Sequence, residues 1–287
     1  MTEDEKIFDV APDEKYVDNR SRFTIFFQVF GRKFWKLISM NLLFIVFNIP
    51  SIIISYFLSA FVTDMFMPFI ANQEDMAIIM MIYGFPFMIF LMVIPAVTVG
   101  PAQAGMTYLL RCFSYEQPTF YWSDFIEKMK ENLKQGIAVC LINLAITAVM
   151  FVDFYLYDQL TAGGANFMFQ LANGLLIIAF ILFLMMNMYI YPMMVTYELK
   201  LRDLYKNAFL FSMGKFLPNL LVLLICFILV MAPMLVVILT GNGTVLFIVY
   251  IYYLLLGFAL PGLVLNFFIN PVIDRYLRPA PAQQADQ

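Results

Sequence analysis

The residues of this chain that could do chemistry are neutral amides and hydroxyls, which form stripes along apolar segments. Eight of them stand out: Asn41, Asn48, Ser51, Ser55, Asn143, Gln170, Asn173 and Asn187. The first four fall within about 80° of arc at ~100° per helical residue. Such side chains either hydrogen-bond neighbouring helices or line a polar cavity. With the 16 tyrosines as aromatic faces, a cavity of this kind would suit a neutral solute such as a saccharide.

The usual catalytic and metal-binding patterns are absent from the sequence. There is no histidine, so the commonest general base and zinc ligand is missing. No phosphate-binding Gly-x-x-x-x-Gly-Lys-Ser/Thr motif occurs, and the three cysteines lie far apart. We therefore expect no enzymatic activity, no cofactor, no metal site and no nucleic-acid partner.

The composition predicts a membrane protein. Hydrophobic residues make up 63% of the chain and its mean hydropathy is +0.83, whereas soluble domains are about 45–50% apolar. Six charge-poor segments are each long enough to cross a bilayer: 37–61, 78–100, 136–157, 167–195, 218–240 and 245–270. The predicted fold is an all-α bundle of six transmembrane helices within residues 21–278. We expect disordered tails at 1–20, which is acidic, and at 279–287.

The positive charges predict the orientation. All 17 Lys and Arg lie in the four stretches 6–36, 111–134, 200–215 and 275–278, which fall in alternate connections. Cytoplasmic connections carry the excess of Lys and Arg in membrane proteins. The sequence therefore predicts a multi-pass plasma-membrane protein with both termini in the cytoplasm.

The basic connections also predict amphipathic cytoplasmic helices at 21–36, 123–135 and 198–213. Their candidate contact residues are Arg32, Lys33, Arg111, Lys128, Lys130, Lys134, Lys200, Arg202 and Lys206. One interpretation is that these helices bind anionic membrane lipid. The other is that they dock a cytoplasmic protein, such as a nucleotide-binding subunit, and the charge pattern does not separate the two.

A Pro-x-x-Thr-x-Gly motif lies near the end of the second apolar segment. Its residues, with the two that follow, are Pro95, Thr98, Gly100, Pro101 and Gly105. Proline removes a backbone donor and disfavours a regular helix, so we expect the helix to bend or break here. The freed carbonyls would line a cavity or bind a partner, or the bend would only guide the chain out of the membrane.

Residues 94–108, followed by Arg111, by Trp122-Ser123-Asp124-Phe125 and by 130–135, resemble the YesL-like family of bacterial membrane proteins. This is a domain family of unknown function, found mostly in Gram-positive bacteria, whose genes often neighbour carbohydrate ABC importers. The resemblance implies a non-enzymatic accessory or regulatory role in carbohydrate uptake, with ABC transporter subunits as partners. The alternative is a stand-alone transporter or channel for a neutral solute such as a saccharide. The sequence leaves the oligomeric state open.

Overall fold

A computed structural model describes residues 21–49, 53, 99–162 and 167–277, and every regular element within these ranges is an α-helix. The all-α prediction is confirmed for this part of the chain. The helices are α1 (Arg22–Arg32), an unlabelled helix Phe34–Ile49, α5 (Val99–Ser114), α6 (Tyr121–Glu131), α7 (Leu133–Ala162), α8 (Phe167–Met194), α9 (Leu201–Gly214), α10 (Phe216–Thr240), α11 (Gly243–Leu255) and α12 (Ala259–Leu277). Both predicted tails, nearly all of the predicted span 78–100 and residues 54–61 lie outside the described residues.

Two helices, α8 and α10, are long and apolar enough to cross a membrane, and the bent pair α11–α12 would make a third span. Only 6% of the most apolar stretch of α8 and of α10 is buried inside the protein. A bare apolar surface of this extent is stable in lipid rather than in water. The structure therefore agrees with a membrane protein, with two or three clear spans in its described part.

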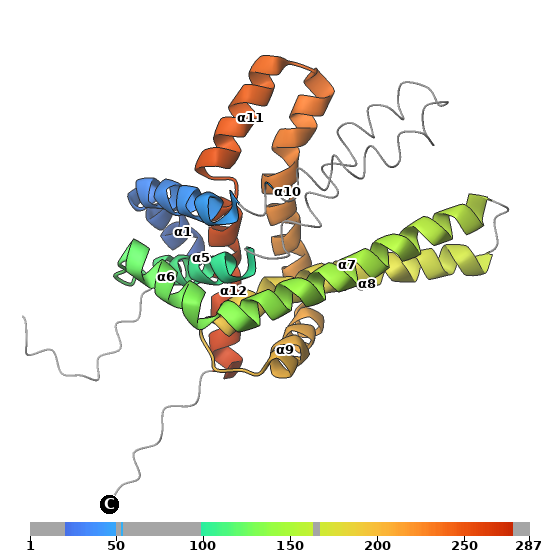
Figure 1. Ribbon diagram of the computed structural model, residues 1–287, viewed down its shortest axis with the longest axis horizontal. Helices are drawn as coiled ribbons and strands as arrows, with labels where there is room; N and C mark the ends of the chain where they lie inside the picture. Colours follow the sequence, from blue (N-terminus) through green and yellow to red (C-terminus); the bar gives the residue numbers. More distant parts are fainter. Residues whose placement is uncertain (1–20, 50–52, 54–98, 163–166, 278–287) are drawn as a thin grey trace, which may run out of the picture.

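The long helices form two hairpins that meet at a common centre (Figure 1). α7 and α8 lie side by side, and α10 pairs with α11. In the view of Figure 1 the two hairpins leave the centre in different directions. The second hairpin turns tightly, with Gly241 in the left-handed region at φ 59° and the side chain of Asn242 capping α11.

The predicted span 245–270 is wrong as one continuous helix. The chain breaks after Leu255 and bends by 50° into α12, which extends to Leu277. Gly257 and Pro261 explain the position of the break: a Cβ on Gly257 would lie 2.6 Å from the Tyr253 ring, and Pro261 cannot donate to a preceding turn.

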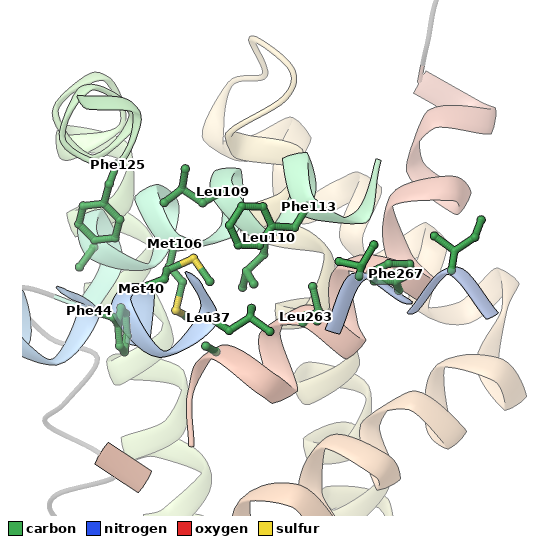
Figure 2. Close-up of a cluster of buried hydrophobic side chains, with 14 residues drawn as sticks. Leu37, Met40, Phe44, Met106, Leu109, Leu110, Phe113, Phe125, Leu263 and Phe267 are labelled. Carbon is green, nitrogen blue, oxygen red and sulfur yellow. The ribbon is translucent and has the colours of Figure 1, made fainter. Parts of the chain in front are cut away.

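α5 and α12 form the centre, because both contribute to the two hydrophobic clusters of the described chain. One cluster joins α1, the helix Phe34–Ile49, α5, α6 and α12 (Figure 2). In it, Leu110 and Phe113 of α5 and Leu263 of α12 are fully buried. The other joins α5 and α12 to α7, α8, α9 and α10. Residues far apart in sequence are thus held around two short helices.

The glycines of the Pro-x-x-Thr-x-Gly region allow α5 to pack closely against its neighbours. A Cβ on Gly100 would lie 2.3 Å from the carbonyl oxygen of Gly136 in α7. A Cβ on Gly105 would lie 2.7 Å from the carbonyl oxygen of Phe125 in α6. Gly100 and Pro101 lie in the first turn of α5, which begins at Val99, so the predicted bend over 95–101 stays a prediction. Pro95 and Thr98 lie outside the described residues.

Candidate functional site

The most polar enclosed site joins α5 to the end of α12, at the carboxylate of Asp274. One guanidinium nitrogen of Arg111 lies 2.8 Å and 3.0 Å from the two oxygens of Asp274. The hydroxyl of Tyr115 donates to Oδ2 at 2.6 Å, and that of Tyr197 donates to Oδ1 at 2.8 Å. The side chains of Arg111 and Asp274 are only 12% and 13% exposed. Three elements are tied to one charge, because Tyr115 follows α5 and Tyr197 follows α8.

The surroundings of Asp274 favour its ionised form. Burial alone would raise its pKa, but the hydrogen bonds from Tyr115, Arg111 and Tyr197, with the charge of Arg111, outweigh burial and lower the pKa. Burial, and then the hydrogen bond to Asp274 and its charge, raise the pKa of Tyr115 to about 12. Tyr115 therefore stays protonated and donates at neutral pH.

An amide ladder continues from Asp274 along one face of α12. Asn270, fully buried one turn before Asp274, donates to Asn266 Oδ1 at 3.0 Å and to Ser114 Oγ at 3.4 Å. Ser114 Oγ in turn donates to the carbonyl of Arg111 at 2.8 Å. Nη1 of Arg111 and Oδ1 of Asn270 are buried and accept or donate no hydrogen bond within the described protein. The ladder can hold α5 against α12, and it contains no nucleophile aimed at open space.

Asn41 joins the helix Phe34–Ile49 to the break between α11 and α12. Its Nδ2 donates to the carbonyls of Tyr253 at 3.0 Å and Leu254 at 2.8 Å. Its Oδ1 accepts from the backbone N–H groups of Phe258 and Ala259, each at 2.9 Å. A broken helix leaves carbonyls on one side and N–H groups on the other without partners. One fully buried amide satisfies both sides of this break.

The amides of α7 and α8 also join helices. Asn143 in α7 donates to Asn187 in α8, and the hydroxyl of Tyr205 in α9 donates to Asn143 Oδ1 at 3.0 Å. Asn187 donates to the carbonyl of Phe183 within its own helix.

The other amides of the predicted stripes lie apart from these contacts. Asn48 is buried and donates to the carbonyl of Phe44. Gln170 is exposed, and Asn173 is half-buried near the start of α8. Ser51 and Ser55 lie outside the described residues. The predicted stripes therefore do not come together around one cavity in the described chain.

Tyrosine hydroxyls of α11 satisfy carbonyls of α10 near Pro233. Pro233 has no N–H, so the carbonyl of Leu229, four residues earlier, loses its helical partner. The hydroxyl of Tyr252 donates to that carbonyl at 2.9 Å, and that of Tyr253 donates to the next one, of Val230. The α10–α11 hairpin is therefore held by hydrogen bonds inside its apolar surface.

Most of the predicted contact residues lie at the surface. Arg32, Lys130, Lys134, Lys200, Arg202 and Lys206 are exposed, whereas Lys33 and Lys128 are half-buried. Arg111 is largely enclosed, because its side chain pairs with Asp274 and is only 12% exposed. Lys128 pairs with Glu131 at 2.6 Å, and its Nζ lies 5.2 Å from the centre of the Tyr108 ring.

Sequence reasoning missed Asp274, Tyr115 and Tyr197. A signal for Asp274 was available: it follows Asn266 and Asn270 at intervals of four, so all three share one helical face. No such signal marks Tyr115 or Tyr197, since their meeting depends on how α5, α8 and α12 pack.

Two hollows stand out in the described part of the chain. One, of about 550 Å³, is open and lined by Arg32, Lys33, Lys36 and Glu116. The other, of about 380 Å³, lies between the aromatic residues of α1 and the apolar faces of α10 and α12. Neither is lined by the predicted amides.

Comparison with known proteins adds one finding. Residues 37–154, somewhat less than half of the chain, match the family described as "Protein of unknown function, DUF624". The match includes the helix with Asn41, the glycines of α5 and Arg111, and it ends before Asp274. No curated protein and no solved structure matches the chain.

Proposed function

We propose that this chain is a non-enzymatic accessory or regulatory subunit of carbohydrate uptake by an ABC-type importer. The link to carbohydrate rests on the resemblance of residues 94–135 to the YesL-like family. The preference for an accessory role over a stand-alone transporter rests on one observation. The buried amides at 41, 219, 266 and 270 and the half-buried amides at 143 and 187 hydrogen-bond neighbouring helices or their own turns, and none of them lines either hollow.

The proposal places six crossings in the plasma membrane, with both termini in the cytoplasm. The sequence between α7 and α8 and the turn at 241–243 carry no Lys or Arg, while α6, α9 and the end of α12 do. Six crossings of one bilayer require the two hairpins to lie nearer to parallel than in Figure 1. Labelling of Asn242→Cys, but not of Lys206→Cys, by an impermeant reagent on intact cells supports this topology. The reverse pattern would overturn it.

The proposed docking surface is α9, together with α6. α9 turns Leu204 and Ala208 inward and leaves Lys200, Arg202 and Lys206 exposed, with Leu210 and Met213 exposed near its end. Charged residues around exposed apolar ones suit a protein partner. This surface would lie on the cytoplasmic side, where the nucleotide-binding subunits of an importer work.

Affinity purification of the full chain from its native membrane in mild detergent, with identification by mass spectrometry, tests the role. We expect an importer subunit to co-purify, and to be lost when Lys200, Arg202 and Lys206 are all changed to Glu. Changing Lys128 and Lys130 to Glu in the same way measures the contribution of α6 to this surface. Failure of any importer subunit to co-purify with the unmodified chain would contradict the proposal.

A further inference from the structure

The open hollow beside α1 gathers three cations around one carboxylate. Arg32 ends α1, Lys33 is its C-cap, and Lys36 follows in the next helix, so one short junction turns all three toward the same space. The fourth lining residue is Glu116, which pairs with Arg32. Three positive groups and one negative group leave the hollow with a net charge of two positive units.

In the described chain, each of the two lysines lies over an aromatic ring. Nζ of Lys33 lies 5.2 Å from the centre of the Phe113 ring, and Nζ of Lys36 lies 5.1 Å from that of Tyr121. Rings stabilise a cation without neutralising it. Burial, with the nearby charges of Lys36 and Arg32, lowers the pKa of Lys33, although Glu116 opposes this. Crowded cations of this kind attract an anion.

Glu116 is held in a backbone conformation that favours glycine. Its φ is 57°, in the left-handed region. The N–H of Gln117 donates to the carbonyl of Cys112, and the N–H of Glu116 donates to that of Phe113, which together form a Schellman C-cap of α5. Glycine is the usual residue at this position, and a side chain there costs about 1 kcal/mol. The strain places a carboxylate against Arg32, and strained residues are frequent at functional sites.

Exposed aromatic residues lie close to the hollow in the sequence and fit the depth of lipid headgroups. Trp35, between Lys33 and Lys36, is 78% exposed, and Phe120, next to Tyr121, is 80% exposed. Trp122 is 63% exposed on the same helix as Tyr121. Tryptophan and tyrosine concentrate at the membrane–water interface. A free anion would not need these apolar neighbours.

We infer that this hollow, formed by Arg32, Lys33, Lys36 and Glu116, binds the phosphate of an anionic phospholipid. Arg32 and the two lysines contact the phosphate. The guanidinium suits two phosphate oxygens at once, and the ammonium groups add point charges. The inference rests on the proposed membrane orientation, which puts the hollow at the cytoplasmic leaflet, where anionic lipids are enriched.

Lipid titration of the purified full chain in neutral detergent, followed by native mass spectrometry, tests the inference. The probes are phosphatidylglycerol and phosphatidylcholine with the same acyl chains. Changing Arg32, Lys33 and Lys36 to Gln should weaken phosphatidylglycerol binding at least about tenfold. The matched control, with Lys200, Arg202 and Lys206 changed to Gln, should weaken it less than about twofold. Glu116→Gln should strengthen it, and phosphatidylcholine binding should not respond.

Three outcomes would overturn the inference. Equal losses in the two triple variants would mean diffuse attraction rather than a site, and weaker binding in Glu116→Gln would remove the role of that residue. Displacement by glycerol 3-phosphate at equal concentration would mean a soluble phosphate ligand. If the triple variant unfolds, Lys36→Gln alone takes its place, because Lys36 is exposed. This single change should also weaken phosphatidylglycerol binding. None of these readouts depends on importer co-purification, so the two proposals fail separately.

Discussion

At the scale of single residues, Asp274 shows how a charge is kept in an enclosed place. Four hydrogen-bonding contacts from Arg111, Tyr115 and Tyr197 replace the water that burial removes. Losing one partner of a buried pair costs more than the pair contributes, because the other charge is left without compensation. The site therefore works as a fastener between α5, α12 and the chain after α8.

Asp274→Asn should lower the free energy of unfolding by about 3 kcal/mol at pH 7, since it leaves Arg111 buried without a counter-charge. The pKa of Asp274 is lower in the folded protein than in the unfolded chain, where it is about 4. The ionised carboxylate therefore contributes fully to the free energy of unfolding when the pH is above the unfolded pKa. This contribution is lost as the pH falls through the folded pKa. Thermal midpoints in detergent should therefore converge for the two proteins below about pH 4.

The matched control for this prediction is Glu131→Gln, which removes an exposed ion pair and should change the free energy by less than about 1 kcal/mol. A difference between Asp274→Asn and the unmodified chain that stayed constant from pH 7 to pH 3 would contradict the assignment.

Asn41→Leu should lower the free energy of unfolding by ~3 kcal/mol, because two carbonyls and two N–H groups at the α11–α12 break would lose their partner. Ser39→Ala is the control, since Ser39 is exposed and bonds only to Trp35 in its own helix. Denaturant titration of both variants measures the effect, and equal stabilities would show that the break does not need Asn41.

At the scale of elements, the position of α5 depends on close approach at glycine. Gly100→Ala should destabilise the protein by about 3 kcal/mol, because its Cβ would lie 2.3 Å from Gly136 O and 2.7 Å from Cys140 Sγ. Gly174→Ala in α8 meets nothing within 4 Å and should stabilise by up to about 1 kcal/mol through helix propensity. Thermal midpoints that moved in the same direction for both would refute the contact.

The hairpin of α10 and α11 offers a prediction about proline. Tyr252→Phe should cost about 1 kcal/mol, since it removes the partner of the Leu229 carbonyl. In a Pro233→Ala background residue 233 regains its N–H and can satisfy that carbonyl, so the same change should cost less than half as much. A double-mutant cycle of unfolding free energies measures this coupling, and additive effects would exclude it.

Sequence patterns predicted the apolar helices well and the breaks between them poorly. The segments expected at 167–195 and 218–240 correspond to α8 and α10 within a few residues, because long uncharged runs permit little else. The break near Gly257 was missed, since the hydropathy of 245–270 is continuous and the break is stabilised by Asn41, over 200 residues away. For the same reason the partners of Arg111 could not be predicted, although the glycines of α5 were singled out.

At the scale of the whole molecule, polar groups fasten helices at a centre from which two apolar hairpins extend (Figure 1). The positive residues of the described chain lie around that centre, and the hairpin tips have none. This division agrees with a protein that presents one basic face to partners or lipid and embeds the rest in the bilayer.

We propose that the amides hold helices together and do not line a path for solute. Saccharide uptake into liposomes that contain only the purified chain tests this proposal, with incorporation verified by flotation. We expect uptake equal to that of empty liposomes for every mono- and disaccharide supplied. Saturable uptake that Asn143→Ala or Asn187→Ala abolishes, while each variant remains folded, would contradict the account and establish a transporter.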